Sequence, residues 1–156
     1  MKKIINFVLN NKQMEVAIEP GESMTDMLRN SCGMKSVKKG CEVGECGACA
    51  ILYDGKTVNS CIMLADLADG HEIMTLEGIT GKDGSLHPVQ QAFIDEASIQ
   101  CGFCIPGFVV TGYELYESGQ KYTREEIREA ISGHLCRCTG YENIVNALEK
   151  LIGKKS

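Results

Sequence analysis

The fold of this chain is decided by the segment Gly40-Cys41-Glu42-Val43-Gly44-Glu45-Cys46-Gly47-Ala48-Cys49, which is followed by eleven residues and then Cys61. The spacing C-x4-C-x2-C with a distant fourth cysteine is the plant-type 2Fe-2S arrangement. A loop that surrounds a small anionic core must bring thiolates to one concave side and backbone amides close to the sulfurs. Gly40, Gly44 and Gly47 supply the close backbone approach and the unusual φ angles that such a loop needs. A zinc site and a disulfide knot are the alternatives, although zinc sites favour C-x2-C pairs.

A second set of four cysteines lies in the C-terminal half of the chain. It consists of Cys101-Gly102-Phe103-Cys104 and, after thirty-one residues, Cys136-Arg137-Cys138. Taken alone, this set could hold zinc nearly as well as iron. The first pair precedes a predicted helix start at Pro106-Gly107, and the second precedes a predicted helix near Tyr141. Because helix N-termini carry a positive dipole end, they favour an anionic iron-sulfur centre.

Length, charge and hydropathy limit the class of protein. The 156 residues, 44% hydrophobic, suffice for one domain or two small ones. A formal charge of -5 gives no electrostatic footprint for nucleic acid or for an anionic membrane surface. No stretch has the length of a membrane span, and the N-terminus lacks an apolar signal region. We therefore expect a cytoplasmic protein, and in a reducing compartment nine cysteines indicate metal or redox ligands before disulfides.

Residues 1–78 are expected to form a small α+β lobe that carries the first cysteine set. Apolar and polar residues alternate in its strand segments, and Asn10-Asn11 and Asp54-Gly55 mark tight turns. Ser23 and Asp26 resemble a capping box at a helix start. The predicted elements are a hairpin over 3–18, a helix over 24–30, a loop over 31–49, a hairpin over 50–58 and a strand over 72–76.

The remainder of the chain predicts a second, all-α lobe. Residues 79–86 are polar and glycine-rich, as is typical of a linker. Residues 87–156 then show helical periodicity in four segments. Pro88 suits a first helical position, and Thr123 with Glu126 forms a capping box. The four helices are expected to begin at Pro88, at Gly107, after Thr123 and near Tyr141, the last one ending before Gly153.

Three motifs occur in the order of a known family. They are Gly40 to Cys49, Gln100 to Cys104 with Pro106-Gly107, and Leu135-Cys136-Arg137-Cys138-Thr139-Gly140-Tyr141. Together they resemble the small iron-sulfur subunit of the xanthine dehydrogenase family of molybdenum hydroxylases, over nearly the whole chain. Within the family, the general similarity favours a xanthine or purine dehydrogenase.

The resemblance implies a β-grasp, ferredoxin-like 2Fe-2S lobe followed by a four-helix 2Fe-2S lobe. It implies that electrons pass from a molybdenum-pterin cofactor in a large subunit, through both clusters, to FAD in a medium subunit and then to NAD or another acceptor. The chain would be one subunit of a hetero-oligomer, with no catalytic residue and no substrate site of its own. By position, Gln100 and Cys138 match residues that touch the pterin. The implied metal ligands are Cys41, Cys46, Cys49, Cys61, Cys101, Cys104, Cys136 and Cys138.

Some residues depart from the usual pattern of the family or lie outside it. Ile105 and Ala50 stand where Thr is frequent, and His134 stands where Asn is usual. His134 is interpreted as a helix-terminal polar residue, or as one that affects the nearby cluster or contacts the large subunit. Cys32 belongs to neither set and predicts a small packed residue. Arg137 would either offset the cluster charge and donate to a phosphate or pterin group, or form a structural salt bridge. His71 and His87 are expected in solvated or capping roles.

Alternative functions remain open at this point. Within the family they are the iron-sulfur subunits of nicotinate dehydrogenase, carbon monoxide dehydrogenase, aldehyde oxidoreductase and hydroxybenzoyl-CoA reductase. Outside it, a free-standing diffusible ferredoxin and a zinc-binding interaction module are the rivals. No Ser/His/Asp set, pair of catalytic carboxylates or phosphate-binding glycine loop is visible in the sequence, so partner subunits are expected to complete the function.

Overall fold

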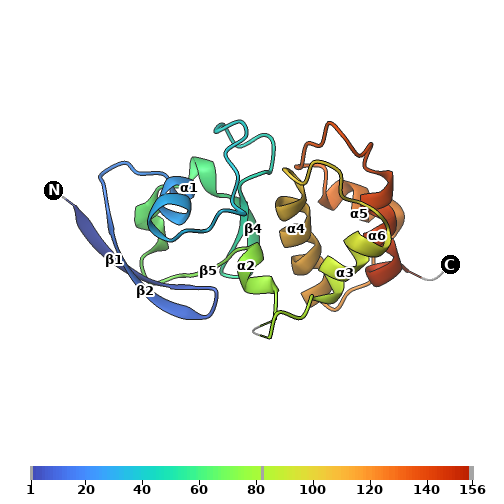
Figure 1. Cartoon of the computed structure of the whole chain (residues 1–156), viewed down its shortest axis with the longest axis horizontal. Coiled ribbons are helices and arrows are strands. Elements are labelled where there is room, and N and C mark those ends of the chain that lie inside the picture. The colour runs from blue at the N-terminus through green and yellow to red at the C-terminus, as the bar shows by residue number, and fades with distance from the viewer. Residues whose placement is uncertain (1, 82, 155–156) are drawn as a thin grey trace.

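The computed structural model describes residues 2–81 and 83–154, which form two lobes side by side (Figure 1). The strands of the N-terminal half lie on the left in this view, and four helices of the C-terminal half lie on the right. The predicted domains also include a few residues outside the described ones: Met1 in the first domain, Lys82 in the linker and residues 155–156 in the last domain. The domain boundaries at 78 and 87 stay a prediction.

The N-terminal lobe is built on one mixed sheet of five strands. Its order is β2-β1-β5-β3-β4, in which β1 and β5 are parallel and every other neighbouring pair is antiparallel. This is the predicted β-grasp arrangement, and both predicted hairpins are present. The strands are β1 (Lys3–Leu9), β2 (Lys12–Ile18), β3 (Ala50–Tyr53), β4 (Lys56–Asn59) and β5 (Glu72–Met74).

A short helix covers one face of the sheet. It begins as α1 (Met24–Asp26) and continues as one π-helical turn, η1 (Met27–Ser31), so the predicted helix over 24–30 is confirmed, although its second half is π-helical. Ser23 caps it, because the hydroxyl oxygen of this residue accepts a hydrogen bond from the amide of Asp26 at 3.1 Å. The apolar side of the helix packs on Phe7 and its neighbours in the core of this lobe.

The strand predicted over 72–76 is two residues too long. β5 ends at Met74, and Leu76 already begins the short helix α2 (Leu76–Ile79). The chain leaves the sheet at Thr75 because its amide donates to the side-chain oxygen of Asn10, at 2.8 Å, instead of to a neighbouring strand. Two 3-10 turns, η2 (Ser60–Ile62) and η3 (Ala65–Ala68), also lack a periodic signal in the sequence.

The C-terminal lobe contains the four predicted helices. They are α3 (Pro88–Asp95), α4 (Ile105–Glu117), α5 (Arg124–Ala130) and α6 (Glu142–Ile152). α4 starts two residues earlier than predicted, because Cys104 occupies the N-cap and Pro106 fits within the first turn. Reciprocal capping boxes begin α3 at His87 and α5 at Thr123, so the capping role expected for His87 is confirmed.

The two lobes are packed against each other through α4 and the second hairpin. Leu52 of β3 is buried in the helical core together with Phe108 and Val109 of α4. Glu114 of α4 accepts a hydrogen bond from the amide of Thr57 in β4, at 2.7 Å. The contact therefore combines apolar burial with a charge-assisted hydrogen bond. Across the described residues, no helix has the length and apolar character that crossing a membrane requires.

Candidate metal centres

The first cysteine loop has no regular secondary structure between η1 and β3, as predicted. Its glycines are required by its geometry. Gly44 and Gly47 have φ angles of 84° and 69°, in the left-handed region. A Cβ atom on Gly40 would lie 2.7 Å from the sulfur of Cys46. The loop can therefore curl closely around its own cysteine side chains only with glycine at these positions.

Backbone amides converge on the sulfur of Cys41. The N–H groups of Val43, Glu45 and Cys46 point at this Sγ atom at 3.5, 3.3 and 3.4 Å. These donors, that of Val43 first, lower the pKa of the Cys41 thiol to about 6. The loop is thus arranged to stabilise a thiolate, the form in which cysteine binds iron.

Cys49 and Cys61 lie beside each other on the inner side of the loop. Cys49 is 2% exposed, and its carbonyl oxygen accepts from the hydroxyl of Ser60 at 2.7 Å. The Ser60 oxygen also lies 2.6 Å from the hydroxyl oxygen of Thr25 on α1, which fixes the turn that presents Cys61. Burial, with the neighbouring Cys49 thiol, raises the pKa of Cys61 to about 11. Cys61 is therefore neutral until a metal binds.

The second cysteine set gathers at the starts of two helices. Cys104 is the N-cap residue of α4, and Cys136 and Cys138 lie in the loop before α6. The sulfurs of Cys101 and Cys138 are 3.6 Å apart. Burial, with the neighbouring thiol of Cys136, raises the pKa of Cys104 to about 12. The four side chains therefore pair as Cys101 with Cys138 and Cys104 with Cys136, although the members of each pair are more than thirty residues apart.

Thr139 and Tyr141 hold the loop around Cys136. The hydroxyl of Thr139 donates to the sulfur of Cys136 at 3.1 Å, and the Thr139 amide approaches the same atom at 3.4 Å. Burial alone would raise the pKa of Cys136, but the Thr139 donors outweigh burial and lower it. The amide of Cys136 in turn donates to the hydroxyl of Tyr141 at 2.8 Å. Neither role was predicted from the sequence, although Thr139 directly follows Cys138 and Tyr141 is three positions after it.

The pairwise arrangement fits a two-iron core. In such a core each iron takes two thiolates, so four cysteines are needed as two pairs. In the first set, Cys41 contacts Cys46 and Cys61 contacts Cys49. The first set therefore forms two pairs, as the second set does. The donor sets therefore fit two 2Fe-2S groups.

The loops that carry the two cysteine sets are in direct contact at the lobe boundary. The carbonyl oxygen of Cys46 accepts a hydrogen bond from the amide of Leu135 at 3.0 Å. The side chain of His134 is 5% exposed, and its Nδ1 atom lies 3.2 Å from the carbonyl oxygen of Gly47. His134 is thus a buried residue at the contact between the two loops, and its contact with a large subunit stays a prediction.

The residues expected to touch the pterin lie at the outer edge of the second set. Gln100, Cys101 and Cys138 are all exposed. Their proximity follows from the 3.6 Å approach of Cys101 to Cys138. Arg137 between the two ligand candidates is exposed as well, and no carboxylate of the described residues forms a salt bridge with it. The structural salt bridge considered for Arg137 is therefore not found among these residues.

Cys32 lies apart from both sets, as predicted. It is partly buried and packs against the core of the N-terminal lobe. Burial raises the pKa of its thiol to about 11, which keeps the side chain neutral. Cys32 is therefore suited to packing, as the sequence indicates.

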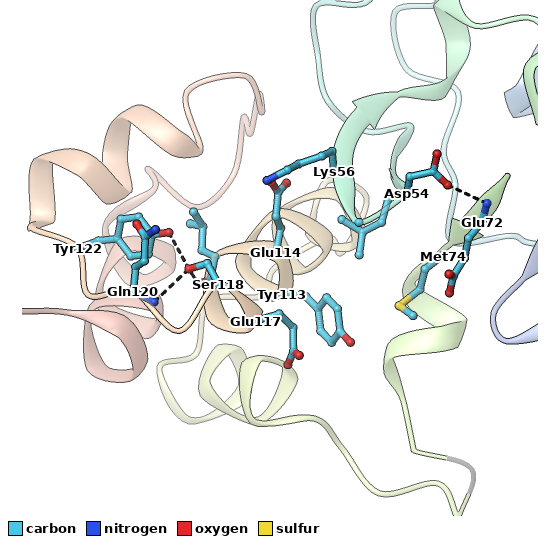
Figure 2. A pocket seen from close by; sticks show the side chains of 13 residues that line it. Asp54, Lys56, Glu72, Met74, Tyr113, Glu114, Glu117, Ser118, Gln120 and Tyr122 are labelled. Carbon is cyan, nitrogen blue, oxygen red and sulfur yellow. Dashed lines mark hydrogen bonds and ion pairs between the residues drawn. The ribbon is translucent and has the colours of Figure 1, made fainter.

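A groove of about 700 Å³ opens between the lobes, away from the cysteines (Figure 2). Its walls come from the second hairpin, β5 and the C-terminal half of α4, and carry both apolar and acidic side chains. Lys56 and Glu114 pair across it, and Tyr113 faces Met74. None of its lining residues is a cysteine. The groove is therefore separate from the candidate metal centres.

Both halves of the chain match known families of iron-sulfur domains. Residues 7–75 match the family described as 2Fe-2S iron-sulfur cluster binding domain, and residues 75–149 match the family described as 2Fe-2S binding domain. The fold and the paired cysteines thus define a protein with two 2Fe-2S binding domains.

Relatives of known function show which proteins of this class the chain resembles. It is 46% identical to the nicotine 6-hydroxylase small subunit of Paenarthrobacter nicotinovorans, over 92% of this chain and 86% of that protein. It is 45% identical to the xanthine dehydrogenase iron-sulfur-binding subunit of Escherichia coli O157:H7, over 92% and 91%. A chain of quinoline 2-oxidoreductase from Pseudomonas putida 86 superposes with a TM-score of 0.91 at 39% identity, over 94% of this chain and 90% of that one. The chain belongs to the small iron-sulfur subunits of the xanthine dehydrogenase family of molybdenum hydroxylases.

Proposed function

We propose that eight of the nine cysteines hold two 2Fe-2S clusters. The observation that carries this proposal is the pairing of the thiols in both sets, above all the 3.6 Å approach of Cys101 to Cys138. The N–H donors around Cys41 and the hydroxyl of Thr139 supply the hydrogen bonds to sulfur that such clusters need. The proposed ligands are Cys41, Cys46, Cys49 and Cys61 for the first cluster and Cys101, Cys104, Cys136 and Cys138 for the second.

The chain is, on this proposal, the electron-transfer subunit of a molybdenum hydroxylase. Electrons enter from a molybdenum-pterin site on a large subunit, cross both clusters, and leave to FAD on a medium subunit and then to NAD or another acceptor. The clusters supply one-electron transfer. The protein contributes a short route between them, because Leu135, bonded to Cys136, donates directly to the carbonyl of Cys46. The chain itself needs no substrate pocket for this role.

Exposed apolar side chains support two different partner surfaces. Phe103 and Leu135 are 46% and 58% exposed beside the second cysteine set, where Gln100 and Cys138 would meet the pterin. Val43 and Ile62 are each 65% exposed beside the first set. Exposed apolar groups that flank a functional centre are typical of protein interfaces. We assign the first of these surfaces to the molybdenum-binding subunit and the second to the FAD-binding subunit.

The substrate of the whole enzyme is proposed to be a nitrogen-containing aromatic ring, and specifically a purine. The three relatives described above are named for nicotine, xanthine and quinoline, which all contain such a ring. The identities to the nicotine and xanthine proteins are nearly equal, so they support the chemical class more strongly than the individual substrate. Because thiolate-bound clusters are best preserved under reducing conditions, the cytoplasm is the proposed compartment.

Purification of the tagged chain under anaerobic, native conditions tests this function. We expect two further chains to purify with it, one carrying molybdenum and one carrying FAD. Hypoxanthine should then bleach the visible absorbance of the clusters, whereas nicotinate and benzaldehyde should do so more slowly. A chain that purifies alone, with both clusters and no bound partner, would instead be a diffusible ferredoxin. Faster bleaching by nicotinate or by the aldehyde would replace the purine with that substrate.

A further inference from the structure

His134 occupies an unusual place, at the boundary between the two cysteine loops. Its ring is 5% exposed although the residue lies only two positions before Cys136. Nε2 lies 2.6 Å from the hydroxyl oxygen of Thr111 on α4. Nδ1 lies 3.2 Å from the carbonyl oxygen of Gly47, within the first cysteine loop. One side chain therefore links the first loop to α4, the helix whose N-cap residue is Cys104.

The two hydrogen bonds determine which nitrogen carries the proton. The Gly47 carbonyl can only accept, so Nδ1 must be the donor. In a neutral imidazole Nε2 is then the acceptor, and the Thr111 hydroxyl donates to it. Both ring nitrogens thus have a hydrogen-bond partner, and His134 and Thr111 are both buried. The imidazole is held in one orientation.

The surrounding backbone is shaped to admit this ring. A Cβ atom on Gly47 would lie 2.2 Å from Nδ1. A Cβ atom on Gly107 would lie 2.3 Å from the Gly47 carbonyl oxygen and 3.1 Å from Nδ1. The ring of Phe108 packs on the other side, with ring centroids 4.9 Å apart. Two glycines on different lobes therefore allow the first loop, α4 and His134 to approach one another closely.

His134 also acts together with its neighbour in sequence. Leu135 donates to the carbonyl of Cys46, and His134 donates to the next carbonyl, that of Gly47. Two consecutive carbonyls of the first loop are thus held by two consecutive residues of the second. A shift of one loop relative to the other would break both bonds.

We propose that His134 is a positioning residue that fixes the first cysteine loop against the helical lobe and so sets the separation of the two clusters. This inference rests on the proposed function, because it requires a cluster in each set. A change in the separation of the clusters alters the rate of electron transfer between them and also their magnetic interaction. The dipolar interaction between two reduced clusters falls with the cube of their distance, so loosening this contact weakens it.

The test uses the full chain with both clusters reduced by dithionite, and EPR at low temperature to measure the splitting between the two spins. His134→Phe keeps an aromatic ring and removes both hydrogen bonds, whereas His134→Asn keeps a side-chain amide that reaches toward Gly47. We expect a reduced splitting for His134→Phe, a splitting near that of the wild type for His134→Asn, and no change for His71→Phe, a residue directly before β5 that pairs with Asp54. Iron and sulfide contents should stay equal in all variants.

Three outcomes separate this inference from the function on which it rests. An unchanged splitting in His134→Phe, with both clusters present, overturns the positioning role. If that variant does not assemble, Thr111→Val decides, because it removes one of the two hydrogen bonds from within α4, outside both cysteine loops. A wild-type splitting in Thr111→Val also overturns the inference. A wild-type chain without labile sulfide instead refutes the clusters themselves.

Discussion

The carbonyl oxygen of Cys46 accepts a hydrogen bond from the amide of Leu135, with 3.0 Å between the two heavy atoms. Cys46 belongs to the first cysteine set, and Leu135 precedes Cys136 of the second. Eighty-nine positions separate these residues in the sequence, yet only one hydrogen bond separates their backbones in the fold. The two candidate centres are therefore parts of one structural unit.

Removal of one proposed ligand should empty one centre only. Cys46→Ala should lower the iron content from about four to about two atoms per chain, because a 2Fe-2S core needs all four thiolates. Cys46 is chosen because it is partly exposed, so that its loss leaves the core of the lobe intact. Iron analysis and the loss of one of two EPR signals check the outcome.

Cys32→Ala is the matched control, since this cysteine lies outside both sets. It should keep the full iron content and both EPR signals. A halved iron content in Cys32→Ala, or a full content in Cys46→Ala, would show that the ligands have been assigned wrongly.

Thr139 should raise the reduction potential of the second cluster. Its hydroxyl donates to the sulfur of Cys136 at 3.1 Å, and such a bond is stronger to the more negative, reduced cluster. If the difference is about 1 kcal/mol, Thr139→Val lowers the potential by roughly 40 mV, since 59 mV is a tenfold change for one electron. Thr139→Ser keeps the hydroxyl and should keep the potential. An EPR-monitored redox titration checks this. Equal reduction potentials in the wild type, Thr139→Val and Thr139→Ser would disprove this role.

Gly107→Ala should destabilise the contact between the lobes. Alanine normally stabilises a helix interior relative to glycine by about 0.5–1 kcal/mol, but here the added methyl group would meet the Gly47 carbonyl at 2.3 Å. Overpacking of this kind costs about 1–3 kcal/mol. Gly133→Ala is the control, because nothing lies within 4 Å of its added Cβ. In urea unfolding, the free energy of unfolding of Gly107→Ala should be lower than that of the wild type, and that of Gly133→Ala should be close to it.

Glu114 should stabilise the fold through the hydrogen bond that it accepts from the amide of Thr57. Its carboxylate accepts from the amide of Thr57 at 2.7 Å and pairs with Lys56 at 3.3 Å, which lowers its pKa in spite of partial burial. Glu114→Ala leaves the Thr57 amide without this partner and should cost about 1–3 kcal/mol in the free energy of unfolding. Glu129→Ala on the exposed side of α5 should change it by less than about 0.5 kcal/mol. Equal effects of both substitutions would argue against a specific contribution from this contact.

The local parts of the architecture could be predicted because their signals are local. The Cys41 to Cys49 spacing, the Asn10-Asn11 turn and the Thr123 capping box each act over a few residues, and all three elements appear where the sequence places them. The end of β5 could not be predicted in this way, because it depends on a hydrogen bond from Thr75 to Asn10.

The contact between the two cysteine loops could not be predicted from the sequence for the same reason. The sequence shows His134 as a polar residue near a helix end, whereas its burial depends on Gly47 and Thr111, which lie in other segments. Thr139 is a different case, since its place directly after Cys138 is a signal that the sequence does contain. A donor side chain adjacent to a proposed ligand cysteine is therefore a feature that the sequence alone contains.

The central claim is that this chain holds two 2Fe-2S clusters, and metal analysis with EPR tests it most directly. Anaerobically purified protein should contain about four irons and about four acid-labile sulfides per chain, and the dithionite-reduced sample should show two distinct S = 1/2 signals. Zinc without labile sulfide would contradict the claim and would leave a structural or interaction module in its place.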